Sequence, residues 1–231
     1  MGLTFASAPA TAGTVTLPDG CTAYVTIQQR QCMVTHHYRC TDDPDGHQWR
    51  VDITTDGPNY TAQIDRETQW IYSRDLLRGD EETLVPDPAD PASLSDLLRH
   101  DLDAWDFETV DQNGARKRFV GFDQITGTTA IDGVNLLVTR SQIEATDETG
   151  LRLWGADGQQ FLHPDWRIFM FGQEAYIEID GSRTEYDHTP VQFIFPGEQG
   201  FLSDTPQYDC NTFMSRRDAR PGAAQLMEVS Q

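Results

Sequence analysis

The chain has 231 residues, of which 38% are hydrophobic and 10% aromatic, so it can bury the core of a single globular domain. Acidic residues outnumber basic ones by 37 to 17, and the formal net charge is −20 at pH 7. Such a surface repels phosphate backbones and anionic headgroups, which argues against nucleic acid or a membrane surface as a partner.

The two ends of the chain are predicted to lie outside the folded domain. Residues 5–10 resemble a small-residue cleavage region, although neither a basic segment nor a long apolar stretch precedes them. We therefore interpret residues 1–14 as a flexible leader remnant, residues 15–214 as one domain, and residues 215–231 as a tail that frays. No stretch of about 18 apolar residues occurs, so no integral membrane segment is expected.

The cysteines predict disulfide bonds. The four are Cys21, Cys32, Cys40 and Cys210, and none belongs to a Cys-x-x-Cys pair typical of redox motifs or zinc ribbons. Disulfides predict a periplasmic or extracellular location. If residues 22–27 and 32–38 form a hairpin, Cys21 lies close to Cys40, which favours Cys21–Cys40 with Cys32–Cys210 among three possible pairings.

Turn chemistry and alternation predict a mainly β protein. Asn113-Gly114 and six Asp-Gly pairs are typical of tight hairpin turns; the pairs begin at Asp19, Asp45, Asp56, Asp132, Asp157 and Asp180. Period-two alternation predicts strands with one buried face. They are expected near residues 22–27, 32–38, 49–54, 60–65, 69–73, 117–122, 135–139, 142–146, 151–154, 166–171, 175–179 and 191–195. This pattern indicates an antiparallel curved sheet, a sandwich or an open barrel.

One amphipathic helix is predicted near residues 91–103. Asp90 suits the N-cap and Pro91 the first helical position. An apolar stripe expected to pack on the sheet consists of Leu94, Leu97, Leu98 and Leu102.

The segment from residue 36 to residue 47 offers candidate metal ligands. His36, Asp45 and His47 carry the side chains that transition metals prefer. His36 and His37 are neighbours on a strand, however, so their side chains point to opposite faces. A polar strand end followed by an acidic turn is the alternative interpretation.

Candidate catalytic residues are His163, Asp165 and His188. A hydrolase site would have to be assembled from such distant residues, because the chain has no Gly-x-Ser-x-Gly motif and disulfide-bonded cysteines offer no nucleophile. Catalysis is therefore not the favoured interpretation, and no cofactor is expected.

The aromatic stretch over residues 161–171 has more large apolar surface than one strand face needs. It forms either the centre of the core or the wall of a cavity for an apolar ligand. In the second case Trp166, Phe169, Phe171 and Tyr176 are the candidate ligand-binding residues.

Successive hairpins, one amphipathic helix and aromatic strands such as residues 165–170 (DWRIFM) give the chain a resemblance to uncharacterised bacterial periplasmic or secreted proteins. In layout it is similar to half-barrel carriers of lipids or lipoproteins. The resemblance implies a non-catalytic exported protein that binds an apolar ligand or a protein partner. A hydrolase and a metal-binding domain are the alternatives, and the sequence leaves the oligomeric state open.

Overall fold

The computed structural model describes residues 13–210, and within them the chain forms thirteen β-strands and one short α-helix. The strands are β1 (Cys21–Gln29), β2 (Met33–Cys40), β3 (Gln48–Thr54), β4 (Gly57–Ile64), β5 (Trp70–Asp75), β6 (Glu81–Leu84), β7 (Leu102–Asp111), β8 (Arg116–Ile131), β9 (Val134–Asp147), β10 (Arg152–His163), β11 (Ile168–Ile177), β12 (Arg183–Asp187) and β13 (Pro190–Ile194). The helix, α1 (Leu94–His100), lies between β6 and β7. The predicted mainly β fold with one helix is therefore confirmed.

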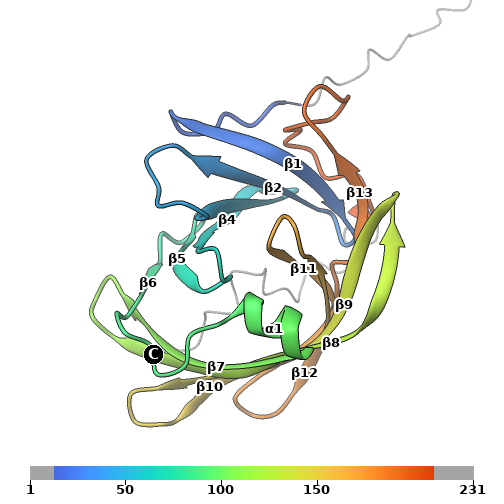
Figure 1. Cartoon of the computed structure of the whole chain (residues 1–231). Helices are drawn as coiled ribbons and strands as arrows, with labels where there is room; N and C mark the ends of the chain where they lie inside the picture. The colour runs from blue at the N-terminus through green and yellow to red at the C-terminus, as the bar shows by residue number, and fades with distance from the viewer. Residues whose placement is uncertain (1–12, 211–231) are drawn as a thin grey trace, which may run out of the picture.

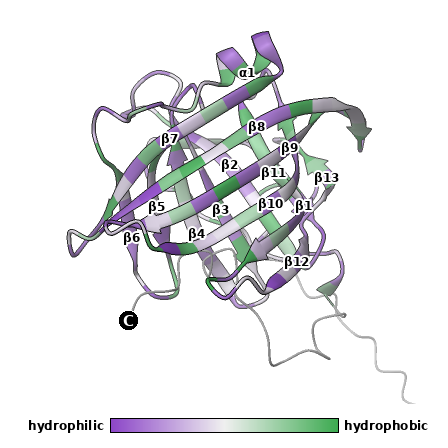
Figure 2. Cartoon of the chain, turned by 90° about the horizontal axis from the view of Figure 1, so that it is seen from below, coloured by the Kyte–Doolittle hydropathy of each residue, from purple (hydrophilic) through white to green (hydrophobic). Residues whose placement is uncertain are grey.

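All the strands belong to one antiparallel sheet. Strands β1 to β12 pair in chain order, and β13 pairs with β1 at the far end of the sheet. The sheet is strongly curved but open, with β12 and β13 at its edges (Figure 1). Only His188 and Thr189 separate these two strands along the chain. This short connection holds the opposite edges near each other, while α1 lies across one end of the curved sheet (Figure 2).

Most of the predicted turns are present. The glycines after Asp19, Asp45, Asp56, Asn113, Asp132 and Asp180 all have positive φ; Gly57 begins β4, directly after its turn, and the others lie in turns or bends. The turn predicted at Asp157-Gly158 is wrong, because both residues lie inside β10. Gly158 instead permits the close approach of β11: a Cβ there would lie 2.4 Å from the Gln173 carbonyl oxygen.

The helix is shorter than predicted. Ser93, not Asp90, is the N-cap, and its hydroxyl accepts a hydrogen bond from the Asp96 backbone amide. Asp101 ends the helix in the left-handed conformation, with φ of 60°. Leu102 therefore begins β7, outside the apolar stripe, and is half exposed. Leu94 and Leu97 are buried as expected, because they pack against Leu162.

Several strand boundaries also differ from expectation. Strands β6, β7 and β12 were not predicted, and the two strands expected at 135–139 and 142–146 are one continuous strand, β9. Trp166 and Arg167 belong to the turn before β11; Arg167 has φ of 57°. Strand β11 then continues without a break to Ile177, so it includes the first part of the separate strand expected at 175–179.

The hydrophobic core joins the two ends of the sheet. Val25 and Ile27 of β1 and Phe193 of β13 share one buried cluster with Ile168 and Met170 of β11. On β1 to β3, another cluster is covered by the segments that flank the sheet, through Val15, Leu17, Phe201 and Leu202. These contacts link the described segments before β1 and after β13 to the sheet.

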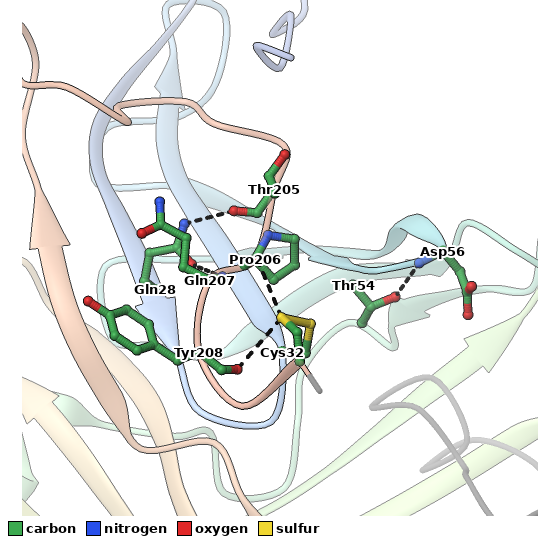
Figure 3. Close-up of a disulfide and its surroundings, with 9 residues drawn as sticks. Gln28, Cys32, Thr54, Asp56, Thr205, Pro206, Gln207 and Tyr208 are labelled. Atoms are coloured by element: carbon green, nitrogen blue, oxygen red, sulfur yellow. Dashed lines mark hydrogen bonds between the residues drawn. A yellow bond between two sulfur atoms is a disulfide. The ribbon is translucent and has the colours of Figure 1, made fainter. Parts of the chain in front are cut away.

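Two disulfides fix the same region. Cys21 is bonded to Cys40 across β1 and β2, and Cys32 is bonded to Cys210. This is the pairing that the predicted hairpin favours. Around the second bond, Gln28 of β1 donates to the Thr205 carbonyl and accepts from the Gln207 amide, so the C-terminal segment follows β1 (Figure 3).

Two predictions about the ends fall largely outside the described residues: most of the leader remnant at 1–14 and the whole tail at 215–231. Thr14, which is described, forms an isolated bridge with Ser203. Within residues 13–210, no helix combines the length and apolar character needed to cross a bilayer.

Candidate ligand-binding cavity

The curved sheet encloses a cavity of about 180 Å³. Its lining comes from strands β2 to β5 and β7 to β11, together with Thr68 and Ala92 from the loops at the helix end. Because side chains alternate between the faces of a strand, one face of each of these strands points inward. Residues from most strands of the sheet therefore form the cavity together, and no single sequence motif encodes it.

Aromatic rings form much of its wall. Phe107 of β7 and Trp70 of β5 line the cavity, and the ring centroid of each lies within 5.5 Å of that of Phe119, a fully buried residue of β8. Trp105 lies over Gly121, where a Cβ would clash with its indole. Trp154 continues the cluster on β10 and packs against Phe119.

A row of polar positions crosses this wall. Asp123 of β8 is paired in register with Ser141 of β9, Ser141 with Gly158 of β10, and Gly158 with Glu174 of β11. Asp123, Ser141 and Glu174 line the cavity. Gly158 has no side chain, and β11 lies close against it: a Cβ there would lie 3.0 Å from the Glu174 Cγ.

A hydrogen bond holds the Glu174 side chain in place, but the surrounding groups do not fully offset the cost of burying its charge. Its Oε1 accepts a hydrogen bond of 2.6 Å from Gln160 Nε2. Burial raises the pKa of Glu174 to about 7, and the Asp123 charge acts in the same direction, while the Gln160 bond and the Arg50 charge oppose the shift. Near neutral pH this carboxyl group is therefore partly protonated.

Asp123 behaves similarly. Its Oδ2 accepts a hydrogen bond of 3.0 Å from the Trp105 indole. Burial raises the pKa of Asp123 to about 6; the Trp105 bond opposes this, and the charge of nearby Asp103 adds to it. The cavity thus contains two carboxyl groups whose ionised forms are disfavoured by their surroundings.

Arg50 projects from the opposite wall. Its guanidinium carbon lies 4.6 Å from the centroid of the Phe171 ring and 5.3 Å from that of Tyr60, which are cation–π distances. Its Nε lies 3.4 Å from Asp52 Oδ2. The paired His37 on β2 is neutral, because burial and then the Arg50 charge lower its pKa to about 3.

The four predicted ligand-binding residues divide into two pairs. Phe169 and Phe171 line the cavity. Trp166 instead packs outside the lining, stacked on His163 and against Phe193. Tyr176 is buried in the aromatic cluster behind the wall, next to Trp154. Trp166 and Tyr176 therefore pack in hydrophobic clusters and do not belong to the described lining of the cavity.

The candidate catalytic residues do not meet in the cavity. His163 and Asp165 lie at the turn between β10 and β11, where His163 Nδ1 accepts from the Trp166 amide. Burial lowers the pKa of His163 despite the Asp165 charge. His188 lies beyond β12, with its ring near Tyr186 and Phe171. Neither histidine belongs to the described lining of the cavity.

The candidate metal ligands are also separated. His36 is buried on β2, with Nδ1 2.9 Å from Thr26 Oγ1, whereas Asp45 and His47 belong to the loop between β2 and β3. In the part of the chain that the structure describes, no three His, Cys, Asp or Glu side chains form a group able to hold a metal ion.

Sequence reasoning missed most of the polar cavity residues and the aromatic pair on β7. A signal was present for the latter, because Trp105 and Phe107 alternate with Asp106 and Glu108. No such signal marks Glu174, Asp123 or Arg50. No protein-family model matches the chain, and neither a curated protein nor a solved structure matches it significantly.

Proposed function

We propose that this protein is a non-catalytic binding protein that holds a small molecule with an apolar, ring-sized body inside its curved sheet. The observation that carries the proposal is the cavity of about 180 Å³ with its aromatic wall. Apolar cavities of about 150 Å³ accept benzene, so this volume suits a single ring or a short chain.

The polar groups of the wall support a ligand with one polar end. Binding sites are mostly apolar with a few placed polar groups that orient the ligand. Here Glu174, Asp123, Ser141 and Arg50 have that role. The Trp154 indole nitrogen also has no hydrogen-bond partner among the described residues, which leaves a donor for a ligand or water.

A cavity lined by inward-facing side chains from many strands favours a small molecule over a protein partner, which would need an extended surface. The positions of His163 and His188 outside the lining give the hydrolase alternative no support. The earlier resemblance to half-barrel carriers fits this proposal, since a curved open sheet around a cavity is the layout it implies.

Export to an oxidising compartment is part of the same proposal, supported by the two disulfides. Thiol alkylation of protein taken directly from its native host tests it. All four cysteines should resist alkylation until a reductant is added, and reaction without reductant would contradict export.

A neutral probe tests ligand binding without assuming any charge. Calorimetric titration with 2-phenylethanol should show one saturable site. Ala156→Phe, on the cavity wall, should abolish binding, whereas Ala130→Phe, on an exposed strand position, should leave it unchanged. Ala62→Phe fills the same cavity from β4 and provides a second test if the first variant does not fold. Equal binding by all these variants would overturn the proposal.

A further inference from the structure

We infer that the ligand is an organic cation, a protonated amine or quaternary ammonium on a ring-sized apolar body, whose charge is received by Glu174 and Asp123. This inference rests on the proposed ligand-binding function and adds the chemical class of the ligand. It begins with the charged groups around the cavity.

Carboxyl groups outnumber cations at this wall. Glu174 and Asp123 face the cavity from β11 and β8, and Arg50 is the charged group that faces them from β3. Arg50 already has a carboxylate beside it, Asp52, at 3.4 Å. His37 of β2 is neutral, and Tyr60 of β4 keeps its proton because burial raises its pKa. A ligand cation would supply the missing positive charge.

The proton affinities of the two acids agree with this reading. Burial raises the pKa of Glu174 to about 7 despite the Arg50 charge, and it raises that of Asp123 to about 6. An ammonium group within about 4 to 6 Å would favour the ionised carboxylates and reverse these shifts. The ligand would then take the place of a proton.

The aromatic wall adds a second means of holding a cation. Quaternary and protonated amines are attracted to the faces of Trp, Tyr and Phe rings. Trp105 illustrates the combination that a cation requires, because it lines the cavity and its indole donates to Asp123. Arg50, over Phe171, shows that rings of this wall already accommodate a cation.

An anionic ligand bound by Arg50 is the competing reading. It would place a further negative charge beside Asp52, Glu174 and Asp123, in a protein whose net charge is already −20. The negative electrostatic field of the whole protein attracts cations and repels anions. It therefore also favours a cationic ligand while the ligand approaches the cavity.

Three probes of similar size separate the possibilities at pH 8: 2-phenylethylamine, 2-phenylethanol and phenylacetate. Calorimetry should give an affinity for the amine at least about tenfold higher than for the alcohol, because a charged hydrogen bond replaces a neutral one. Glu174→Gln and Asp123→Asn should each remove most of that preference. Glu185→Gln, an exposed position on β12, is the matched control and should retain it.

The alcohol affinity of each variant reports whether its cavity is intact. Loss of amine binding with alcohol binding preserved supports the inference. Equal affinity for amine and alcohol, or tightest binding of phenylacetate, overturns the cation assignment and leaves the proposed function standing. Absence of binding by all three probes overturns both.

Discussion

Gly158 of β10 faces Glu174 of β11 so closely that a Cβ on the glycine would lie 2.6 Å from the Glu174 Cα. Real Cβ atoms essentially never lie that close to another atom. The atom in the way belongs to the backbone, so it cannot move aside as the end of a flexible side chain could. The absence of a side chain at the glycine therefore allows β10 and β11 to lie close together, and this spacing positions Glu174 at the cavity.

Gly158→Ala is expected to lower the free energy of unfolding by about 1–3 kcal/mol, because the two strands must separate. Gly127→Ala in β8 is the control, since nothing lies within 4 Å of the added Cβ; its stability should be unchanged or higher by up to about 1 kcal/mol. Urea denaturation measures both. Equal stability of the two variants would show that the close approach has no energetic consequence.

The face of α1 that anchors it to the sheet is tested by two adjacent leucines. Leu97 is 1% exposed and packs with Leu162, whereas Leu98 is 37% exposed. Leu97→Ala should cost about 3 kcal/mol of unfolding free energy, and Leu98→Ala less than about 1 kcal/mol. The reverse order in thermal or urea denaturation would place the wrong face of the helix against the sheet.

The two disulfides should differ in their effects on stability. Cys32–Cys210 joins residues 178 positions apart and Cys21–Cys40 residues 19 apart. Because a longer closed loop restricts the unfolded chain more, replacing the first pair with serine should cost about 5 kcal/mol and the second about 3 kcal/mol. Chemical denaturation of the two double variants provides the comparison, and a larger loss for Cys21–Cys40 would contradict it.

Glu174 gives the ligand-free protein a specific pH dependence. Its pKa is about 7 when folded against an ordinary value of 4.5, so between these values the folded protein holds a proton that the unfolded chain has released. The contribution of Glu174 to the unfolding free energy therefore falls as pH rises through this window. Glu174→Gln lacks this loss, so its stability relative to the parent should increase from pH 5 to pH 8.

Urea denaturation at the two pH values tests this, with Glu185→Gln as the control, whose difference from the parent should not change. A pH-independent difference for Glu174→Gln would mean that the folded protein does not raise the pKa of this carboxyl group.

The sequence predicted the fold class because its turn and alternation signals are local. The hairpin at Asp132-Gly133, for example, needs only residues that accept positive φ. Strand β7 was missed because Leu102 continued the apparent helical stripe of α1. Asp101, in the left-handed conformation, ends that helix.

The cavity was only partly predictable. Phe169 and Phe171 belong to a dense aromatic stretch, so the local sequence alone indicates them as candidate ligand-binding residues. Glu174, Asp123 and Arg50 come from three distant strands in a chain with 37 acidic residues, and their juxtaposition depends on the register of the whole sheet. No local pattern distinguishes a carboxyl group inside the cavity from one in solvent.

The most direct test of the central claim is the location of a bound probe. Intermolecular nuclear Overhauser effects should connect the ring protons of 2-phenylethylamine with Phe107, Phe171 and Trp154 of the labelled full chain. Their absence, together with contacts at exposed apolar residues such as Leu77 or Leu151, would place the probe on the surface and contradict a ligand-binding cavity.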